Sequence, residues 1–176
     1  HRSSWPAGIC TSVIPPALPL SLSPAASVSF EVTFTPGSAG LHAGAVAIGS
    51  NDPDEDPLVI ALGGEGSEPD IAVSPLTLDF GTVEIGFCNS LAFDVANEGT
   101  DDLAVSAVTA SNPVFAASPG AFTVMPGASS AVTAQFCPTA TGSWSGTLAI
   151  ASNDPDENPV LVAVSGNGIA IPDIDV

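Results

Sequence analysis

The hexapeptide Ser-Asn-Asp-Pro-Asp-Glu occupies residues 50–55 and occurs again, 102 residues later, at residues 152–157. Each copy lies between two short apolar runs and is followed by several glycines. When residues 34–66 are aligned with residues 136–168 without a gap, 16 of the 33 positions are identical. A repeat of this length has the size of a domain and is too long for one turn of a solenoid. The sequence therefore predicts tandem copies of one domain.

Short alternating segments surround the repeated hexapeptide and predict β-strands. Val28, Phe30, Val32 and Phe34 alternate with polar residues, which is the pattern of a half-buried strand. The 17 glycines and 17 prolines separate runs rich in Val, Thr, Ser and Ala, which favours many short strands over helices. We expect an all-β chain, with residues 1–26 extended or irregular because they are rich in Pro and Ser.

The predicted strands follow from these patterns in both copies. The first copy is expected to have strands at residues 28–35, 45–48 and 58–62. The second is expected to have strands at residues 71–73, 76–80, 90–96, 103–109, 114–117, 122–124, 130–136, 147–151 and 160–164. In both copies we expect the glycines that follow the last strand to end it.

The charge balance limits the partners of the chain. The net charge is −18, Arg2 is the single Lys or Arg residue, and nineteen carboxylates oppose it. Binding to nucleic acid or to an anionic membrane surface needs Lys or Arg, so both are disfavoured. No apolar run reaches the roughly 20 residues of a membrane helix. The sequence opens at His1 without an initiator Met or signal peptide, from which we expect a processed or excised segment.

Four motifs together resemble one known family. They are Leu-Asp-Phe-Gly-Thr-Val at residues 78–83, Val-Ala-Asn-Glu-Gly at 95–99, Phe-Cys-Pro at 136–138 and Ser-Asn-Asp-Pro at 152–155. This set resembles the Hydin-type (ASH) immunoglobulin-like repeats, particularly the bacterial choice-of-anchor D domains. The resemblance implies an antiparallel sandwich of about seven strands, akin to the major sperm protein fold. It also implies a structural or binding module without catalysis, which in bacteria lies in exported surface proteins.

The resemblance and the repeat predict the domain organisation. Residues 1–66 are expected to be a partial repeat, residues 67–168 a complete one, and residues 169–176 the first strand of a following repeat. The partial repeat would expose the side chains predicted to face inward, namely Phe30, Phe34, Ile48, Val59 and Leu62. Leaving about 500 Å² of apolar surface in water forfeits about 12 kcal/mol, so we expect something to cover it.

The cysteines are interpreted with the fold that the resemblance implies. In that fold the strand that Cys88 opens and the strand that Cys137 closes are antiparallel neighbours. We therefore predict a Cys88–Cys137 disulfide, with two buried free thiols as the alternative. Cys10 is left over and is either free or linked to another chain.

The acidic turns allow two interpretations. Carboxylates on a tight loop can converge on Ca²⁺, and the candidates are Asp52, Asp54, Asp56, Asp154, Asp156 and Glu157. The same residue types build β-turns, because Asn and Asp side chains bond to nearby backbone and Pro presets φ. We favour the turn, because neither an EF-hand glycine nor the spacing of a bidentate Glu is present, and we expect no other cofactor.

Catalysis has few candidate residues in this sequence. The chain has two histidines, His1 and His42, and neither Lys nor Tyr, so a nucleophile with its base is hard to assemble. We expect no enzyme and no small-molecule substrate.

The end of the sequence suggests how copies associate. Residues 172–176 (Pro-Asp-Ile-Asp-Val) repeat residues 69–73 (Pro-Asp-Ile-Ala-Val). One hypothesis is head-to-tail strand donation into the partial repeat, which builds a filament. The residues proposed for this contact are Ile169, Ile171, Ile174, Val176, Phe30 and Phe34. The alternative is that the chain is a piece of a longer repeat protein.

The sequence therefore predicts a non-enzymatic structural protein, secreted or at the cell surface, in a stalk or fibre. Its expected partners are copies of itself or other repeats of the same protein. The alternative function is an adhesion or recognition module for a protein or glycan.

Overall fold

The computed structural model describes residues 2–4, 9–14 and 20–170, and every regular element in these ranges is a β-strand. Within the same ranges no helix is long and apolar enough to cross a membrane. The chain divides into two compact units, residues 1–67 (unit one) and residues 68–176 (unit two). The prediction of an all-β immunoglobulin-like fold is confirmed.

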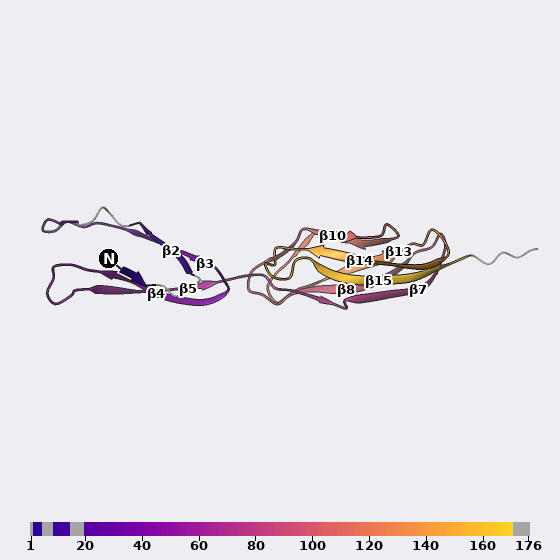
Figure 1. Cartoon of the computed structure of the whole chain (residues 1–176), viewed down its shortest axis with the longest axis horizontal. Coiled ribbons are helices and arrows are strands. Elements are labelled where there is room, and N and C mark those ends of the chain that lie inside the picture. Colours follow the sequence, from indigo (N-terminus) through magenta and orange to yellow (C-terminus); the bar gives the residue numbers. More distant parts are fainter. Residues whose placement is uncertain (1, 5–8, 15–19, 171–176) are drawn as a thin grey trace, which may run out of the picture. The chain divides into compact units, whose positions relative to one another are not determined.

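Unit two is a two-layer sandwich with a small additional pair of strands (Figure 1). Its strands are β6 (Ile71–Ser74), β7 (Thr77–Glu84), β8 (Asn89–Asn97), β9 (Leu103–Val105), β10 (Ala107–Ala110), β11 (Phe115–Ser118), β12 (Phe122–Val124), β13 (Ser129–Phe136), β14 (Gly142–Ala151) and β15 (Val160–Ile169). One sheet has the order β10-β14-β15-β7, the other has the order β11-β13-β8-β6, and β12 pairs with β9. Neighbouring strands are antiparallel except β15 and β7, which are parallel.

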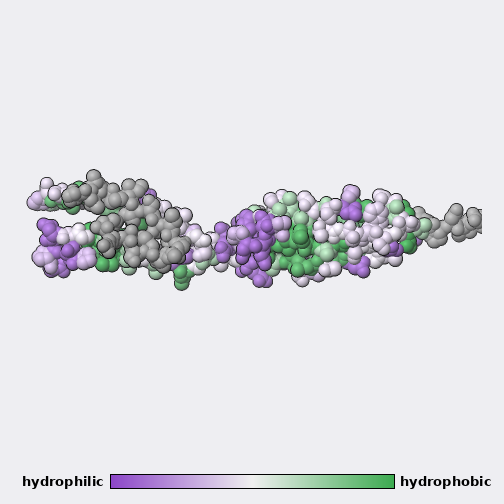
Figure 2. All heavy atoms as spheres, in the orientation of Figure 1, coloured by the Kyte–Doolittle hydropathy of each residue, from purple (hydrophilic) through white to green (hydrophobic). Residues whose placement is uncertain are grey.

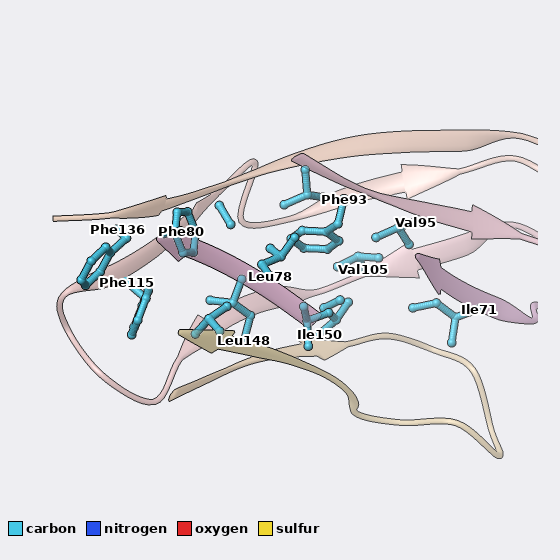
Figure 3. Close-up of a cluster of buried hydrophobic side chains, with 14 of the residues drawn as sticks. Ile71, Leu78, Phe80, Phe93, Val95, Val105, Phe115, Phe136, Leu148 and Ile150 are labelled. Carbon is cyan, nitrogen blue, oxygen red and sulfur yellow. The ribbon is translucent and has the colours of Figure 1, made fainter. Parts of the chain in front are cut away.

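The core of unit two lies between these sheets and is filled by alternate residues of both (Figure 3). Phe93, Leu148 and Ile150 are almost completely buried. At one end of the core the rings of Phe115 and Phe136 stack with centroids 4.9 Å apart, and the Phe80 ring lies 5.8 Å from that of Phe136. Burial of these large apolar side chains is the main stabilising contribution to such a sandwich.

The strand predicted at residues 103–109 is two strands in the structure. Residues 103–105 form β9 and pair with β12, whereas residues 107–110 form β10 and pair with β14. The backbone N–H of Ser106, between them, donates to the carbonyl of Ala151. The chain changes sheets at this residue, and alternation of apolar residues alone does not mark such a change.

The glycines after the repeated hexapeptide do not end the last strand, so that prediction was wrong. Gly166 and Gly168 lie inside β15, which continues to Ile169. A Cβ atom on Gly166 would lie 2.5 Å from the ring of Phe136. Glycine is therefore required here for close packing of a phenylalanine against the strand.

The described residues of unit one form five strands: β1 (Arg2–Ser4), β2 (Ile9–Ile14), β3 (Glu31–Pro36), β4 (Gly40–Ile48) and β5 (Leu58–Gly66). They form a sheet of order β1-β4-β5 and a β2-β3 pair. Residues 1–26 were expected to be extended or irregular, and β1 and β2 are extended segments of that region that also pair with other strands.

The strand pairing of unit one matches part of unit two. Thr11 of β2 lies opposite Phe34, as Phe115 of β11 lies opposite Phe136. β1 pairs with β4 as β10 pairs with β14, and β4 pairs with β5 as β14 pairs with β15. Hence β1 to β5 correspond to β10, β11, β13, β14 and β15. The described part of unit one has no counterpart of β6, β7, β8, β9 or β12.

Candidate functional site

The side chains of unit one that correspond to the core of unit two form an apolar surface, which we call the open face. It consists of Phe30, Val32, Phe34, Val46, Ile48, Ile60 and Leu62. The residues 102 positions later are all at most 3% exposed. In unit one Val46 is buried to the same degree, but Phe30, Phe34 and Ile60 are 36%, 38% and 38% exposed. The same positions therefore form a closed core in one unit and a partly exposed surface in the other.

Val59 does not belong to this face, although it was predicted to point inward. It is exposed in unit one, but its counterpart Leu161 is also exposed in the complete sandwich. Its neighbour Ile60 corresponds to the buried Val162 and is the inward residue. Because successive side chains of a strand alternate between the two faces, an error of one position reverses the assignment.

Two strand edges border the open face. In unit two β15 pairs with β7 along its outer edge, and β13 pairs with β8 over its full length from Ser129 to Phe136. Their counterparts β5 and β3 are terminal strands among the described sheets of unit one. Unpaired edge strands beside an exposed apolar surface are a template for a further strand.

The acidic turn of unit two fastens the first strand of that unit. The Asp154 carboxylate is 2% exposed, and its Oδ2 accepts a 2.7 Å hydrogen bond from the backbone N–H of Ile71. Its Oδ1 accepts hydrogen bonds from the N–H groups of Asp156 and Glu157. Burial opposes the charged form, but these N–H donors outweigh it and hold the pKa of Asp154 below its usual value. The Asp154 carboxylate beside it raises the pKa of Asp156.

The turn of unit one has similar internal hydrogen bonds, but the described part of that unit contains no strand fastened to the turn in this way. The Asp52 carboxylate accepts a hydrogen bond from the N–H of Asp54. Hydrogen bonding with the side chain and then the backbone of Asp54 lowers the pKa of Asp52. The N–H of Ser50 donates to Asp56 at 2.8 Å, just as the N–H of Ser152 donates to Asn158 at 3.0 Å. Asp52 is exposed, and the described part of unit one offers it no equivalent of Ile71. These contacts are those of a turn that caps its own backbone.

Calcium binding at the turns stays a prediction. Carboxylate oxygens of Asp70, Asp154 and Glu157 lie within 4.8 Å of one another. Asp70 was not among the candidates from the sequence, because it lies far from the turn in the chain. The Asp154 oxygens in this cluster already accept three backbone N–H groups. Among the described residues, Asp52, Asp54 and Asp56 form no comparable cluster.

Asn97 is a second polar residue that sequence reasoning missed. It is 1% exposed, and its side-chain oxygen accepts from the N–H groups of Asp70 and Gly99. Its amide nitrogen donates to the carbonyls of Asp101 and Val124. The side chain thus joins the start of unit two to its interior loops. The sequence did contain a signal for this role. Asn97 is a polar residue at the end of an alternating strand, directly before Glu98-Gly99.

Cys88 and Cys137 are joined by a disulfide with an S–S distance of 2.05 Å, the pair proposed from the sequence. In unit one Thr35 occupies the position of Cys137. Cys10 lies in β2 opposite Thr35. Unit one therefore has no cysteine at the position that corresponds to Cys137, where unit two covalently attaches the residue before β8.

Comparison with known proteins agrees with this architecture. Residues 69–167, more than half of the chain, match the family of HYDIN/CFA65/VesB-like Ig-like domains. The chain belongs to this family.

The solved structures similar to this HYDIN/CFA65/VesB-like chain share its fold at low sequence identity. The ASH/PapD-like domain 7 of human CEP192 is 15% identical, with a TM-score of 0.53, covering 60% of this chain and 89% of that one. A Porphyromonas gingivalis W83 protein of unknown function is 16% identical, with a TM-score of 0.53, covering 94% of this chain and 87% of that one. A search of curated proteins finds no match.

The residues proposed for assembly in this HYDIN/CFA65/VesB-like chain lie in three different places. Ile169 is the last residue of β15 and lies opposite Glu84 of β7, so it belongs to the sandwich of unit two. Ile171, Ile174 and Val176 lie outside the described residues. Phe30 and Phe34 lie on the open face.

Removing the Asp154 carboxylate is expected to destabilise unit two. Asp154→Ala leaves the buried N–H of Ile71 without its acceptor, which should lower the free energy of unfolding by about 2 to 3 kcal/mol. Because the folded pKa is depressed, the contribution is present above the usual pKa of about 3.9 and is lost as the pH falls through the folded value. Urea unfolding between pH 7 and pH 2 measures both effects.

The matched control is Asp52→Ala, in the equivalent turn of unit one. Asp52 is exposed and lies in unit one, so unit two should keep its unfolding midpoint. An Asp154→Ala protein with unchanged stability at pH 7 would contradict the assigned role of the carboxylate.

Proposed function

We propose that this chain is a non-enzymatic, extracellular structural repeat protein, part of a surface stalk or fibre. Unit two serves as a self-contained bead, and unit one joins to other repeats by accepting strands. The observation that carries this proposal is the contrast at equivalent positions: Phe136 is fully buried, whereas Phe34 is 38% exposed. An apolar face bordered by two strand edges that pair with no further strand among the described residues is suited to association by added strands.

Three features support the extracellular and non-catalytic parts of the proposal. A disulfide across unit two suits an oxidising compartment. The family consists of Ig-like domains, a fold that acts widely as a spacer or a binding module. Two histidines, with neither Lys nor Tyr, leave few groups for acid–base or nucleophilic catalysis.

Self-association is tested by native mass spectrometry and electron microscopy over a range of concentrations. We expect oligomers or filaments whose population rises with concentration, because the open face is covered in the assembled state. Ile60→Ser should reduce assembly, since Ile60 lies on the open face. Val59→Ser is the matched control, since Val59 points outward. Monomers at every concentration would contradict the assembly part of the proposal.

A recognition module is the second candidate, and three surface features of unit two favour it. Figure 2 shows apolar atoms on the visible face of this unit, beside a hydrophilic end. Leu76 and Leu161 are about half exposed. A shallow groove of about 430 Å³ is lined by Asp79, Gly81, Thr82, Ser143, Trp144, Ser145, Ser165, Gly166 and Asn167. Binding in a glycan screen that is lost on Asp79→Ala would favour this function.

A further inference from the structure

We propose that the groove on the outer face of unit two binds a neutral glycan through two rows of hydrogen-bonding side chains. The inference rests on the recognition module given above as the second candidate function, and it specifies the ligand class and the contacts of that module. The groove is built on β14, β15 and β7, which are neighbours in one sheet.

Strand pairing places six polar side chains of the groove in two rows across these strands. The rows are Ser143, Asn167 and Thr82, and, beside it, Ser145, Ser165 and Asp79. On β15, Ser165 and Asn167 alternate with residues that are buried against the core, so the rows lie on the outer face. Neighbouring strands are about 4.8 Å apart, and residues two positions apart along a strand are separated by about 7 Å. Hydroxyl, amide and carboxylate groups are therefore presented at regular, short spacings.

A bulge in β7 brings both of its residues to this face. Asp79 and Thr82 are three positions apart, and in a regular strand that spacing would put them on opposite faces. Between them the pairing with β15 shifts register, and Gly81 has a φ of +65°. The Asp79 Oδ1 accepts a 3.0 Å hydrogen bond from the N–H of Gly81, which holds the bulge in place. Bulges re-aim side chains beside binding sites, and this one adds a carboxylate and a hydroxyl to the groove.

The groove contains hydrogen-bonding groups that the rest of the protein does not use. The other asparagines of unit two bond to backbone groups through their side chains, namely Asn89, Asn97, Asn112, Asn153 and Asn158. The side chains of Asn167, Ser143 and Ser165 make no hydrogen bond to another described residue. An amide and hydroxyls that are free in this way offer both donors and acceptors to a ligand.

The fold of the β14-β15 hairpin does not require these residue types. Unit one builds the same hairpin from β4 and β5 in the same register. Glycine is kept at the position of Gly166, but the positions of Ser143, Ser145, Ser165 and Asn167 are occupied by Leu41, Ala43, Gly63 and Glu65. The polar rows are therefore a property of unit two, and hairpin folding does not explain them.

Charge and shape select the ligand class. Asp79 is the one charged side chain that lines the groove, and Arg2 is the single Lys or Arg residue of a chain with a net charge of −18. A sulfated sugar or a uronic acid would be repelled and would find no cation in the groove. A neutral sugar carries neighbouring hydroxyl groups that donate and accept, which the two rows complement. The volume of about 430 Å³ is within the usual range of roughly 300 to 1,000 Å³ for small-ligand sites.

The test screens the full chain against an array of neutral oligosaccharides, with sulfated and uronic-acid oligosaccharides on the same array. We expect binding to one or more neutral sugars and to none of the charged ones. Calorimetry with a bound sugar should give one site per chain and a dissociation constant of about 1 mM, since the groove is shallow. Absence of binding to every neutral oligosaccharide at about 10 mM, or a preference for the charged ones, would overturn the proposal.

Variants of the chain locate the site. Asn167→Ala removes the central amide of one row and should weaken binding about tenfold or more. Ser143→Leu introduces the side chain that unit one carries at this position, so it keeps the test valid if Asn167→Ala unfolds unit two. It should also weaken binding. Thr133→Ala is the matched control, because it removes an exposed hydroxyl from β13 in the other sheet. Equal binding by the wild-type, Asn167→Ala and Ser143→Leu chains would place the sugar elsewhere and overturn the inference.

Sugar binding and self-association fail independently. A chain that assembles but binds no neutral sugar keeps the structural function and loses the glycan site. A chain that stays monomeric but binds the sugar in the groove does the reverse. Binding of charged oligosaccharides alone keeps the recognition module and overturns the ligand class inferred for it.

Discussion

Replacing Phe136 by alanine is expected to lower the free energy of unfolding of unit two by about 3 to 5 kcal/mol. The ring is completely buried, stacks on Phe115 and packs against the backbone of Gly166. Its removal leaves a cavity between two sheets whose spacing is fixed by many other contacts, so the site cannot collapse to fill it. Urea unfolding followed by hydrogen exchange of the β8 and β13 amides measures the loss in unit two alone.

The matched substitution in unit one is Phe34→Ala. Phe34 contacts the His42 ring at a centroid distance of 5.8 Å but is 38% exposed. Its removal should cost about 1 kcal/mol or less in the isolated chain. Equal losses for the two phenylalanines would show that unit one has a closed core of its own.

Loss of the disulfide is the second large effect expected. Cys88→Ser together with Cys137→Ser should destabilise unit two by about 3 to 4 kcal/mol, because the bond restricts a long loop of the unfolded chain. The two cysteines are 49 residues apart. Urea midpoints with and without reductant should differ in the wild-type chain and coincide in the double variant.

Cys10→Ser is the control for the disulfide experiment. Cys10 lies in β2 of unit one, so the midpoint of unit two should not change. A wild-type chain whose unit-two transition is insensitive to reductant would contradict the stabilising role of the bond.

The repeat and the alternation of apolar residues were sufficient to predict much of the core. Strands were predicted at residues 90–96 and 130–136, and their apolar residues Phe93, Val95 and Phe136 are buried in the structure. Alternation is informative there because one face of each strand is dry and the other wet. It was ambiguous at Val59 and Ile60, where two apolar residues are adjacent and the register depends on strand pairing.

The sites that sequence analysis missed depend on contacts between distant residues. Asp154 was recognised as a turn residue, but its bond to Ile71 joins residues 83 positions apart. Asp70 and Asn97 likewise acquire their roles from the return of the chain to the same end of the sandwich. A local pattern identifies the turn but not the strand that it fastens.

The glycines after the repeated hexapeptide were also misinterpreted because local sequence does not show distant contacts. Gly64 and Gly166 were predicted to end their strands, but both lie within strands. A Cβ atom at either would strike the ring of Phe34 or Phe136. The requirement for glycine comes from the opposite sheet, which no local pattern contains.

The sequence alone determined that the chain is all-β, that it repeats after 102 residues, and that its surface is strongly acidic. These properties follow from residue periodicity and composition, which act within one strand or turn. Only the tertiary structure decided that β1 and β2 belong to unit one and that β6, β7, β8, β9 and β12 have no counterpart in its described part. Strand pairing and burial depend on which segments meet in space, and for that reason they separate a closed core from an open face built of similar residues.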